Sequence, residues 1–244
     1  MERVVLVTGS SSGIGREIVR KLAGYYEVII HYNNSSTEAF SLKEELDKLY
    51  NKDIMMVKCD LSSEEEIDNM LEKIYERYAN IDILINNAGI AIDTLVENKT
   101  KDNFIKTLEV NTIASFLLMQ KIGLKMKENK YGNIVNISST NGIDTIYPES
   151  LDYDASKAAL ISVSKNMANY LAPYVRVNTI CPGWVNTRMN SELDDAFIET
   201  EEEKILLRRF GNPEEIANVV KFLISDEASY VNNTIIRVDG GVKC

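Results

Sequence analysis

The sequence predicts an α/β protein with one doubly wound sheet of seven parallel strands and helices on both faces. Short β-branched apolar runs alternate with helical patterns along the whole chain, as in a parallel sheet that is covered on both sides. A turn rich in glycine and serine joins the first run to the first helical stripe. No Pro/Gly/Ser-rich linker, repeat or low-complexity tract divides the 244 residues, so we expect a single domain over residues 1–244.

The expected strands follow from the apolar runs, at 4–8, 27–32, 54–58, 81–85, 133–137, 175–180 and 235–238. The expected helices follow from apolar residues that recur at three- and four-residue spacing, at 14–22, 36–49, 63–78, 100–128, 153–171 and 212–223. Asn111 interrupts the apolar stripe of the longest helix. It marks either a kink that holds a water molecule or a surface position.

The segment 187–210 breaks the alternation of strand and helix. Its acidic residues are Glu192, Asp194, Asp195, Glu199, Glu201, Glu202 and Glu203, and apolar residues lie between them at helical spacing. Such a charge run can be a solvated helix face. Because an insertion after a strand's carboxyl end often covers the ligand crevice of an α/β sheet, we favour a substrate lid at about 187–210.

Composition excludes several function classes. The net charge of −10 argues against nucleic-acid binding, which needs a basic surface. The single histidine and three widely spaced cysteines predict no metal site and no disulfide framework. No apolar run has the length of a membrane span, and no charged-then-apolar leader precedes the first strand. These features predict a cytoplasmic protein.

The turn from Gly9 to Gly15 is a candidate nucleotide site. Its glycines at 9, 13 and 15 let the backbone take a positive φ and let a ligand approach closely. The helix that follows would direct free N–H groups and its positive end at a pyrophosphate. The alternative is a tight strand-to-helix turn without a ligand. With nucleotide binding, the fold is of the Rossmann type.

Tyr153 and Lys157 are four residues apart on a predicted helix and therefore lie on the same face. An ammonium group close to a phenol favours the phenolate, so we expect a lowered pKa for Tyr153 and a role as general acid or base. Ser138 and Ser139 end the fifth predicted strand, where a hydroxyl could stabilise charge on a substrate oxygen. The alternatives are an ordinary exposed pair and turn-forming serines.

These features occur together in an order that resembles the short-chain dehydrogenase/reductase family, and most closely its 3-oxoacyl-[acyl-carrier-protein] reductase branch. The matching residues are Thr8-Gly9-x-x-x-Gly13-x-Gly15, Asp60-Leu61, Asn86-Asn87-Ala88-Gly89, Asn111, Ser139, Tyr153-x-x-x-Lys157, Pro182-Gly183 with Thr187, and Val238-Asp239-Gly240-Gly241. The resemblance implies that Tyr153 is the proton donor or acceptor and that Ser139 orients the substrate oxygen. It also implies that Lys157 holds the ribose and tunes Tyr153, and that Asn111 positions a water molecule in a proton relay.

The same resemblance implies a nicotinamide cofactor, with hydride transfer between it and a carbonyl or secondary alcohol. The residues that it assigns to the cofactor are Gly9, Ser11, Ser12, Gly13, Ile14, Gly15, Tyr32, Asn33, Asp60, Leu61, Asn87, Ala88, Gly89, Tyr153, Lys157, Pro182, Gly183, Val185 and Thr187. Tyr32 stands where an acid would bind the ribose hydroxyls and repel a 2′-phosphate. We therefore favour NADP(H), with NAD(H) possible because neither Ser12 nor Asn33 is basic.

Three functions remain open at this point: a ketoreductase of the 3-oxoacyl-carrier-protein type, a sugar, polyol or small secondary-alcohol dehydrogenase, and a non-enzymatic dinucleotide sensor. An acyl carrier is acidic, as this chain is, so docking would use a local basic patch. The candidates for that patch are Lys121, Lys125, Lys127 and Lys130. His31 is expected to be a strand-end residue, and Trp184 either lines the substrate pocket or packs beneath the lid. The apolar helix at 104–126 predicts a homotetramer.

Overall fold

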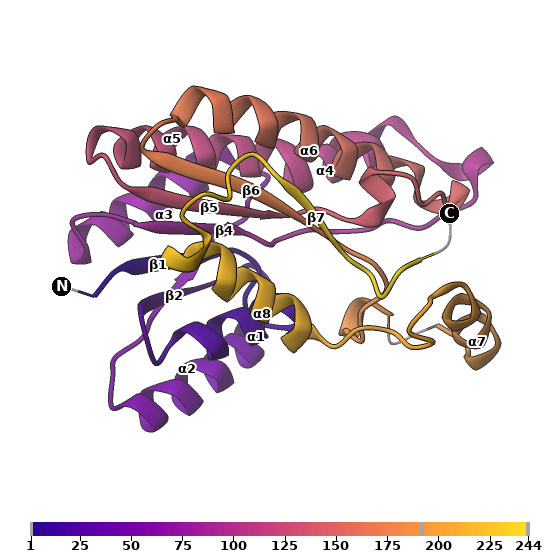
Figure 1. Cartoon of the computed structure of the whole chain (residues 1–244), viewed down its shortest axis with the longest axis horizontal. Helices are drawn as coiled ribbons and strands as arrows, with labels where there is room; N and C mark the ends of the chain where they lie inside the picture. The colour runs from indigo at the N-terminus through magenta and orange to yellow at the C-terminus, as the bar shows by residue number, and fades with distance from the viewer. Residues whose placement is uncertain (1, 191–192, 243–244) are drawn as a thin grey trace.

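One seven-stranded parallel sheet forms the centre of the molecule (Figure 1). The computed structural model describes residues 2–190 and 193–242. The strand order is β3-β2-β1-β4-β5-β6-β7, and the order reverses between β1 and β4, as in a doubly wound sheet. The strands are β1 (Val4–Val7), β2 (Glu27–Tyr32), β3 (Met55–Lys58), β4 (Ile83–Asn86), β5 (Gly132–Ile137), β6 (Val175–Pro182) and β7 (Ile235–Val238). The predicted fold class is confirmed.

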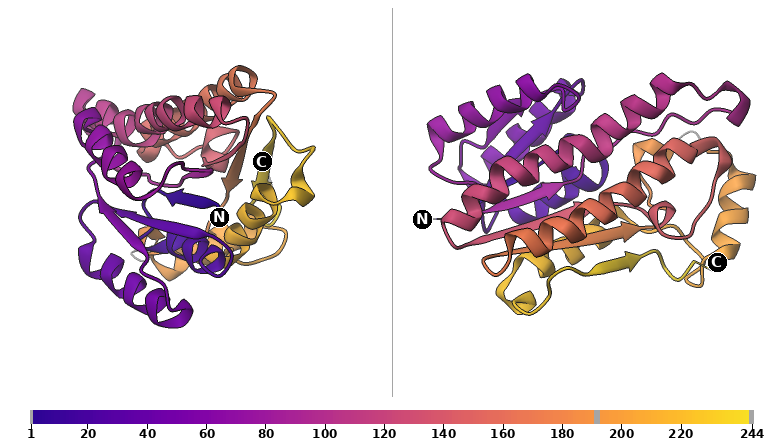
Figure 2. Two further views of the ribbon diagram at one scale, coloured as in Figure 1. Left: turned by 90° about the vertical axis from the view of Figure 1, so that its left-hand side faces the viewer. Right: turned by 90° about the horizontal axis from the view of Figure 1, so that it is seen from above.

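Helices cover both faces of this sheet, which lies between two helical layers (Figure 2). On one side are α3 (Glu64–Arg77), α4 (Lys101–Leu108), α5 (Ala114–Glu128) and α6 (Leu151–Leu171); on the other are α1 (Gly13–Leu22), α2 (Ser36–Tyr50) and α8 (Pro213–Ile224). Each layer has its own apolar core, because successive strand residues point to opposite faces. Leu6 packs on the α3–α6 side, for example, and Val5 on the α1–α8 side.

The long helix expected at 100–128 is interrupted, and Asn111 is the reason. The turn Glu109–Ile113 is a π-helix between α4 and α5. Asn111 is fully buried there, and its amide pairs with the backbone of Ile90 on both sides, accepting from Ile90 N (2.8 Å) and donating to Ile90 O (2.9 Å). A π-turn of this kind is frequent at functional sites. The interruption that the sequence indicated is therefore present as a π-turn, and the alternative of a surface position for Asn111 is wrong.

The predicted lid segment contains one helix, α7 (Asp195–Lys204), which lies beyond the carboxyl ends of the strands and apart from both helical layers (Figure 1). Two isolated β-bridges hold the chain segments that flank α7. Val185 and Gly211 form a parallel bridge, and Ile205 and Val242 form an antiparallel one. Glu192, one of the acids noted in the sequence, lies outside the described residues.

The described residues contain neither a candidate membrane span nor a candidate metal cluster. None of the helices in residues 2–190 and 193–242 has the length and hydropathy needed to cross a bilayer. Within the same residues, no three histidine, cysteine, aspartate or glutamate side chains gather in a way that could hold a metal ion.

Candidate active site

The glycine turn after β1 packs directly against the residues that follow β4. Gly9 and Gly13 have positive φ values of 60° and 53°, which side chains other than glycine rarely adopt. A Cβ on Gly9 would lie 2.8 Å from the Cα of Ala88, and one on Gly15 would lie 2.5 Å from Nδ2 of Asn87. The Asn87 amide donates to the carbonyls of Thr8 (2.9 Å) and Gly9 (3.1 Å). Steric exclusion and these bonds fix the shape of the turn.

His31 supports this turn from beneath. Its Nδ1 accepts a hydrogen bond from Gly9 N (2.9 Å), and its Nε2 lies 3.1 Å from the carbonyl oxygen of Cys59. Because a carbonyl can only accept, the proton of the neutral ring is on Nε2. Burial lowers the pKa of His31 to about 4, so the ring is neutral at physiological pH. The sequence placed His31 at a strand end, which is correct, but gave no sign of this supporting role.

A hollow of about 500 Å³ lies beside the turn, between α1 and the lid segment. Its lining includes Gly13, Arg16, Thr187 and Arg188, and a Cβ on Gly13 would be only 3.4 Å from the Thr187 methyl group. The structure thus brings Thr187, predicted as a cofactor residue, to the glycine turn. Arg16 is held by Glu45 (3.2 Å) and by the Glu38 carbonyl (3.0 Å).

The ends of β2 and β3 bring together the residues predicted around the adenosine. Two hydrogen bonds from Ser62, from its backbone N (2.9 Å) and its hydroxyl (2.7 Å), lower the pKa of the Asp60 carboxyl, and the Asn33 side chain adds to the effect. Tyr32 is half-buried beside them. No carboxylate belongs to residues 32–35 at the end of β2, as the sequence indicated.

The four side chains that the sequence assigned to catalysis meet at the carboxyl edge of the sheet. Lys157 Nζ lies 5.5 Å from the centre of the Tyr153 ring and donates to the carbonyl of Ile137 (2.9 Å). The Ser139 side chain lies close enough to the Tyr153 phenol to affect its pKa. A Cβ on Gly89 would lie 3.3 Å from both Lys157 Nζ and Asn111 Oδ1. The two serines have different partners, because Ser138 donates to the Lys157 carbonyl (2.9 Å).

The expected direction of the Tyr153 pKa shift is wrong. Burial raises the pKa of Tyr153 to about 12, and the hydrogen bond to Ser139 only partly opposes this. Burial also lowers the pKa of Lys157 to about 8. Both shifts have one cause, since a site removed from water disfavours the charged form of either group. Spacing along a helix shows that the two groups are neighbours, but it does not show how dry their surroundings are.

Asn141 and Asp154 control the Ser139 hydroxyl, and the sequence gave no sign of them. Asn141 Nδ2 donates to Asp154 Oδ1 (2.7 Å). Since a carboxylate only accepts, Asn141 must turn its oxygen toward Ser139, whose hydroxyl donates to it (3.0 Å). The backbone N of Asn141 donates in return to Ser139 Oγ (3.2 Å). The proton and one lone pair of the serine are therefore held in fixed directions.

Comparison with known proteins decides the family. Residues 9–243 match the family described as "Enoyl-(Acyl carrier protein) reductase". A 3-oxoacyl-[acyl-carrier-protein] reductase of Aquifex aeolicus is 41% identical over 98% of this chain and 97% of its own length. The chain belongs to the short-chain dehydrogenase/reductase family. The predicted resemblance is confirmed, and the chain is an oxidoreductase that acts on carbonyl or CH–OH groups.

Other short-chain dehydrogenase/reductases are similar over nearly the same length. The 3-oxoacyl-[acyl-carrier-protein] reductase of Thermotoga maritima is 36% identical over 98% of this chain and 97% of its own. Among solved structures, acetoin dehydrogenase from Salmonella typhimurium has a TM-score of 0.88 at 30% identity, covering 99% of this chain and 96% of that one. A putative gluconate dehydrogenase from Agrobacterium tumefaciens has a TM-score of 0.92 at 28% identity, with coverage of 98% and 94%.

Proposed function

We propose that this short-chain dehydrogenase/reductase is an NADP(H)-dependent ketoreductase that reduces 3-oxoacyl thioesters, with Tyr153 as the general acid. The observation that carries the proposal is the position of the half-buried Tyr153 side chain, which lies next to Ser139 and has its ring centre 5.5 Å from Lys157 Nζ. With a pKa of about 12, the phenol holds its proton at neutral pH and can donate it to a carbonyl oxygen. When a carbonyl substrate binds, the Ser139 hydroxyl turns its proton from Asn141 Oδ1 to the carbonyl oxygen and polarises it, and Lys157 supplies positive charge beside the phenol.

The residues present fit a dinucleotide. In the glycine turn, Gly13 lines the hollow without a Cβ that would approach the Thr187 methyl group, and α1 begins there with its free N–H groups. The hollow of about 500 Å³ extends from this turn toward Thr187. We infer that the pyrophosphate binds over Gly9–Gly15 and the adenosine near Asp60. A bound nicotinamide supplies the hydride.

Two observations support a preference for NADP(H), and one opposes it. The end of β2 carries no acid that would repel a 2′-phosphate. In addition, the Arg16 guanidinium donates to the Ser11 carbonyl (3.4 Å), which places its positive charge at the glycine turn. Against it, Glu45 already neutralises part of the Arg16 charge. NAD(H) therefore remains the alternative. Comparing KM for NADPH and NADH tests this, and a strong preference for NADH would contradict the proposal.

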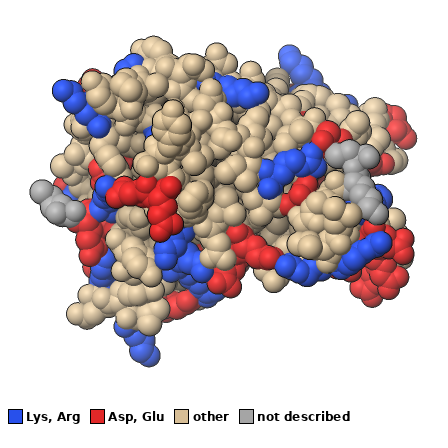
Figure 3. Space-filling view, in the orientation of Figure 1, with Lys and Arg blue, Asp and Glu red and all other residues tan. Residues whose placement is uncertain are grey.

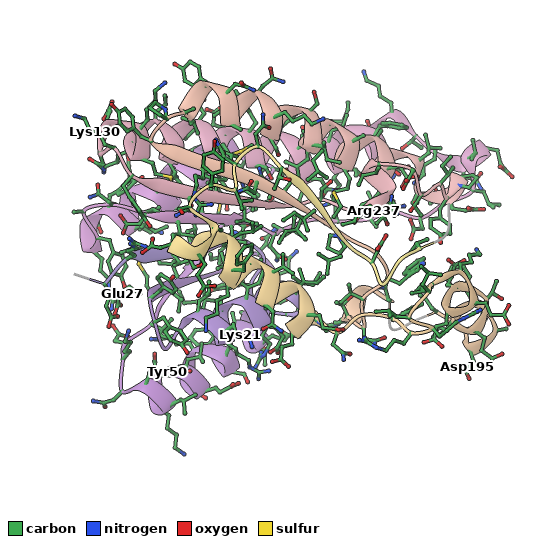
Figure 4. The ribbon with its side chains drawn as sticks, in the orientation of Figure 1. Lys21, Glu27, Tyr50, Lys130, Asp195 and Arg237 are labelled. Atoms are coloured by element: carbon green, nitrogen blue, oxygen red, sulfur yellow. The ribbon has the colours of Figure 1, made fainter. Side chains whose placement is uncertain are left out.

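The proposed basic docking patch for an acyl carrier lies at the wrong end of the molecule. Lys130 follows α5 at the edge where β5 begins, whereas Arg237 and Asp195 lie near the opposite edge (Figure 4). Ser139 follows the carboxyl end of β5, so the catalytic side chains belong to that opposite edge. Lys121 is already paired with Glu64 (3.1 Å) and Asp68 (2.7 Å). These lysines do not support carrier docking, so the proposal concerns the thioester itself rather than the carrier.

A small secondary alcohol or sugar is the second candidate substrate. It is favoured by the acids on the outer face of α7, which would repel an acidic carrier (Figure 3), and by the acetoin and gluconate dehydrogenases among the similar structures. A substrate panel distinguishes the two: acetoacetyl thioester, acetoin, simple ketones and glucose, each followed by the absorbance of the reduced nicotinamide. We expect thioester turnover. Its absence together with turnover of acetoin or glucose would establish the second candidate.

We further propose that the chain folds as a single domain over residues 1–244 with its lid at about 187–210, is cytoplasmic and assembles as a homotetramer. Apolar side chains on α4, on the π-turn and on α5 support assembly, since Ile105, Ile113 and Leu124 are each at least 38% exposed. Light scattering of the purified protein checks this; a monomer would contradict it.

A further inference from the structure

Glu201 differs from the other acids of α7, because its side chain is turned inward. It is 5% exposed, whereas Asp195, Glu199 and Glu203 are exposed. Phe197 and Ile198 share its face of the helix at three- and four-residue spacing and are half-buried. Figure 3 shows acidic side chains gathered over the outer surface of this end of the molecule. A buried carboxylate is retained only where partners compensate for the loss of water.

Three donors surround this carboxylate. Oε2 accepts from the Tyr147 hydroxyl (2.6 Å) and from Trp184 Nε1 (3.1 Å), and Oε1 accepts from Lys204 Nζ (2.6 Å). Burial alone would raise the pKa of Glu201, but the bonds from Lys204, Tyr147 and Trp184 outweigh it and lower the pKa. Glu201 therefore remains ionised at neutral pH, which strengthens each of these hydrogen bonds.

Aromatic rings surround the same point. Trp184 is stacked on Phe210 with 5.5 Å between ring centres, and it meets Phe197 and Tyr147 edge-on at 5.6 Å each. Phe197 belongs to α7, whereas Trp184 directly follows β6 and Gly183. Of the two positions expected for Trp184, packing beneath the lid is the one observed. Such ring pairs add to the stability of the contact beyond the area that they bury.

Tyr147 connects this cluster to the catalytic loop, by which we mean residues 138–150 between β5 and α6. Its hydroxyl is bonded to the lid, while its backbone N donates to Asp154 Oδ2 (3.4 Å), the carboxylate that orients Asn141 and hence Ser139. A cavity of about 160 Å³ lies at the junction of loop and lid and is lined by Thr145, Tyr147, Glu201 and Lys204 among others. The lid and the segment that carries Ser139 and Tyr153 are thus joined through one residue.

We propose that Glu201, Tyr147 and Trp184 form a latch that fixes α7 against the catalytic loop, and that this latch makes Glu201 and Tyr147 specificity-determining residues. With the latch closed, the rings of Tyr147, Trp184 and Phe197 are fixed next to the loop that positions Ser139, and the selectivity that we infer from this is for short acyl groups over long or branched ones. The kinetic part of this inference rests on the proposed ketoreductase function. The contact between α7 and the catalytic loop does not depend on that function.

Trp184 is the only tryptophan of the chain, so its fluorescence reports the latch directly. Glu201→Ala removes the shared acceptor, and Glu203→Ala is the matched control on the exposed face of the same helix. We expect acrylamide quenching of Trp184 to increase about threefold in Glu201→Ala and to remain unchanged in Glu203→Ala, because the indole N–H loses its partner and the rings separate. Equal quenching in the two variants would overturn the latch.

Tyr147→Phe removes a single hydroxyl and is the milder test if Glu201→Ala does not fold. Its quenching should increase in the same direction, and an unchanged value would also count against the latch. In kinetics, both variants should raise KM for acetoacetyl thioester about tenfold with little change in kcat. Both variants should also reduce the preference for acetoacetyl thioester over a branched 3-oxoacyl thioester. An unchanged preference would overturn the specificity role of Glu201 and Tyr147. Absence of all turnover in the wild type would instead contradict the proposed function. The fluorescence test would then still decide whether the latch exists.

Discussion

The two sides of the active site are held in place by different chemistry. On the cofactor side, uncharged groups fix the backbone: Gly9 N donates to the neutral His31 ring, and the Asn87 amide donates to the carbonyls of the turn. On the substrate side, carboxylates hold the side chains and the loop backbone in place. Asp154 orients Asn141 and the Tyr147 backbone, and Glu201 holds Tyr147 and Trp184.

This difference indicates which side of the site tolerates amino-acid substitution. The cofactor side depends on positions where a Cβ cannot fit, so its requirements are steric: Gly9 lies against Ala88 and Gly15 against Asn87. The substrate side depends on pairs of groups from separate segments, such as Asn141 with Asp154 and Tyr147 with Glu201. Such pairs can be exchanged for others without altering the sheet, which suits a family whose members share a cofactor site and differ in substrate.

The largest effect is expected from Gly15→Ala on the cofactor side. The new Cβ would lie 2.5 Å from both Asn87 Nδ2 and the Gly9 carbonyl oxygen, and the backbone atom cannot move away. Such overpacking should lower the free energy of unfolding by about 3 kcal/mol and weaken nucleotide binding. Gly211→Ala is the control, because its nearest contact would be 3.6 Å. Denaturant unfolding of both variants checks this; equal stabilities would contradict the steric account.

The next largest effect concerns pH and His31. The folded-state pKa of about 4 lies below the reference value of 6.5, so the unfolded chain takes up a proton first as the pH falls. Stability should therefore decrease from pH 6.5 toward pH 4, with about 2 kcal/mol lost by pH 5 through this group. His31→Asn should lack this part of the slope. If the wild type and the variant lose stability in parallel between pH 6.5 and 5, His31 is not the neutral support described here.

A smaller effect is expected from Asn141→Ala on the substrate side. Without the side-chain amide, the Ser139 hydroxyl keeps its bond from the backbone N of residue 141 but loses the acceptor that fixes its proton. We expect kcat for the carbonyl substrate to fall about tenfold while KM changes little, because one positioning bond is worth about that much. Asn166→Ala, on the exposed side of α6, is the control. A change confined to KM would show that Asn141 acts on binding and not on Ser139.

The sequence predicted the cofactor side far better than the substrate side. Glycine spacing and strand-end motifs placed Gly9–Gly15, Asn87–Gly89 and Thr187 where the structure brings them together. The π-turn was visible only as an interruption at Asn111, because a wider turn leaves no spacing of its own. Glu201 was hidden in a run of acids; its position three and four residues after Ile198 and Phe197 was the one signal that it faces inward.

The Tyr153 pKa could not be predicted from the sequence for a different reason. The spacing to Lys157 showed that the two groups share a face, and Coulomb attraction was taken as decisive. In the folded protein, burial outweighs it and raises the pKa of the phenol to about 12 while it lowers that of the ammonium group to about 8. Desolvation depends on every element packed around the site, here including the π-turn, whose Asn111 and Thr112 are hydrogen-bonded to Ser156, and no local pattern records it.

The most direct measurement is carbonyl reduction by Tyr153→Phe, with NADPH binding followed separately by the fluorescence of the reduced nicotinamide. The ring of phenylalanine preserves the packing beside Lys157 and removes only the hydroxyl that lies next to Ser139. The account predicts unchanged NADPH binding and a loss of turnover of about 10²- to 10⁴-fold, the usual contribution of a general acid. Turnover at the wild-type rate would show that the proton comes from another group.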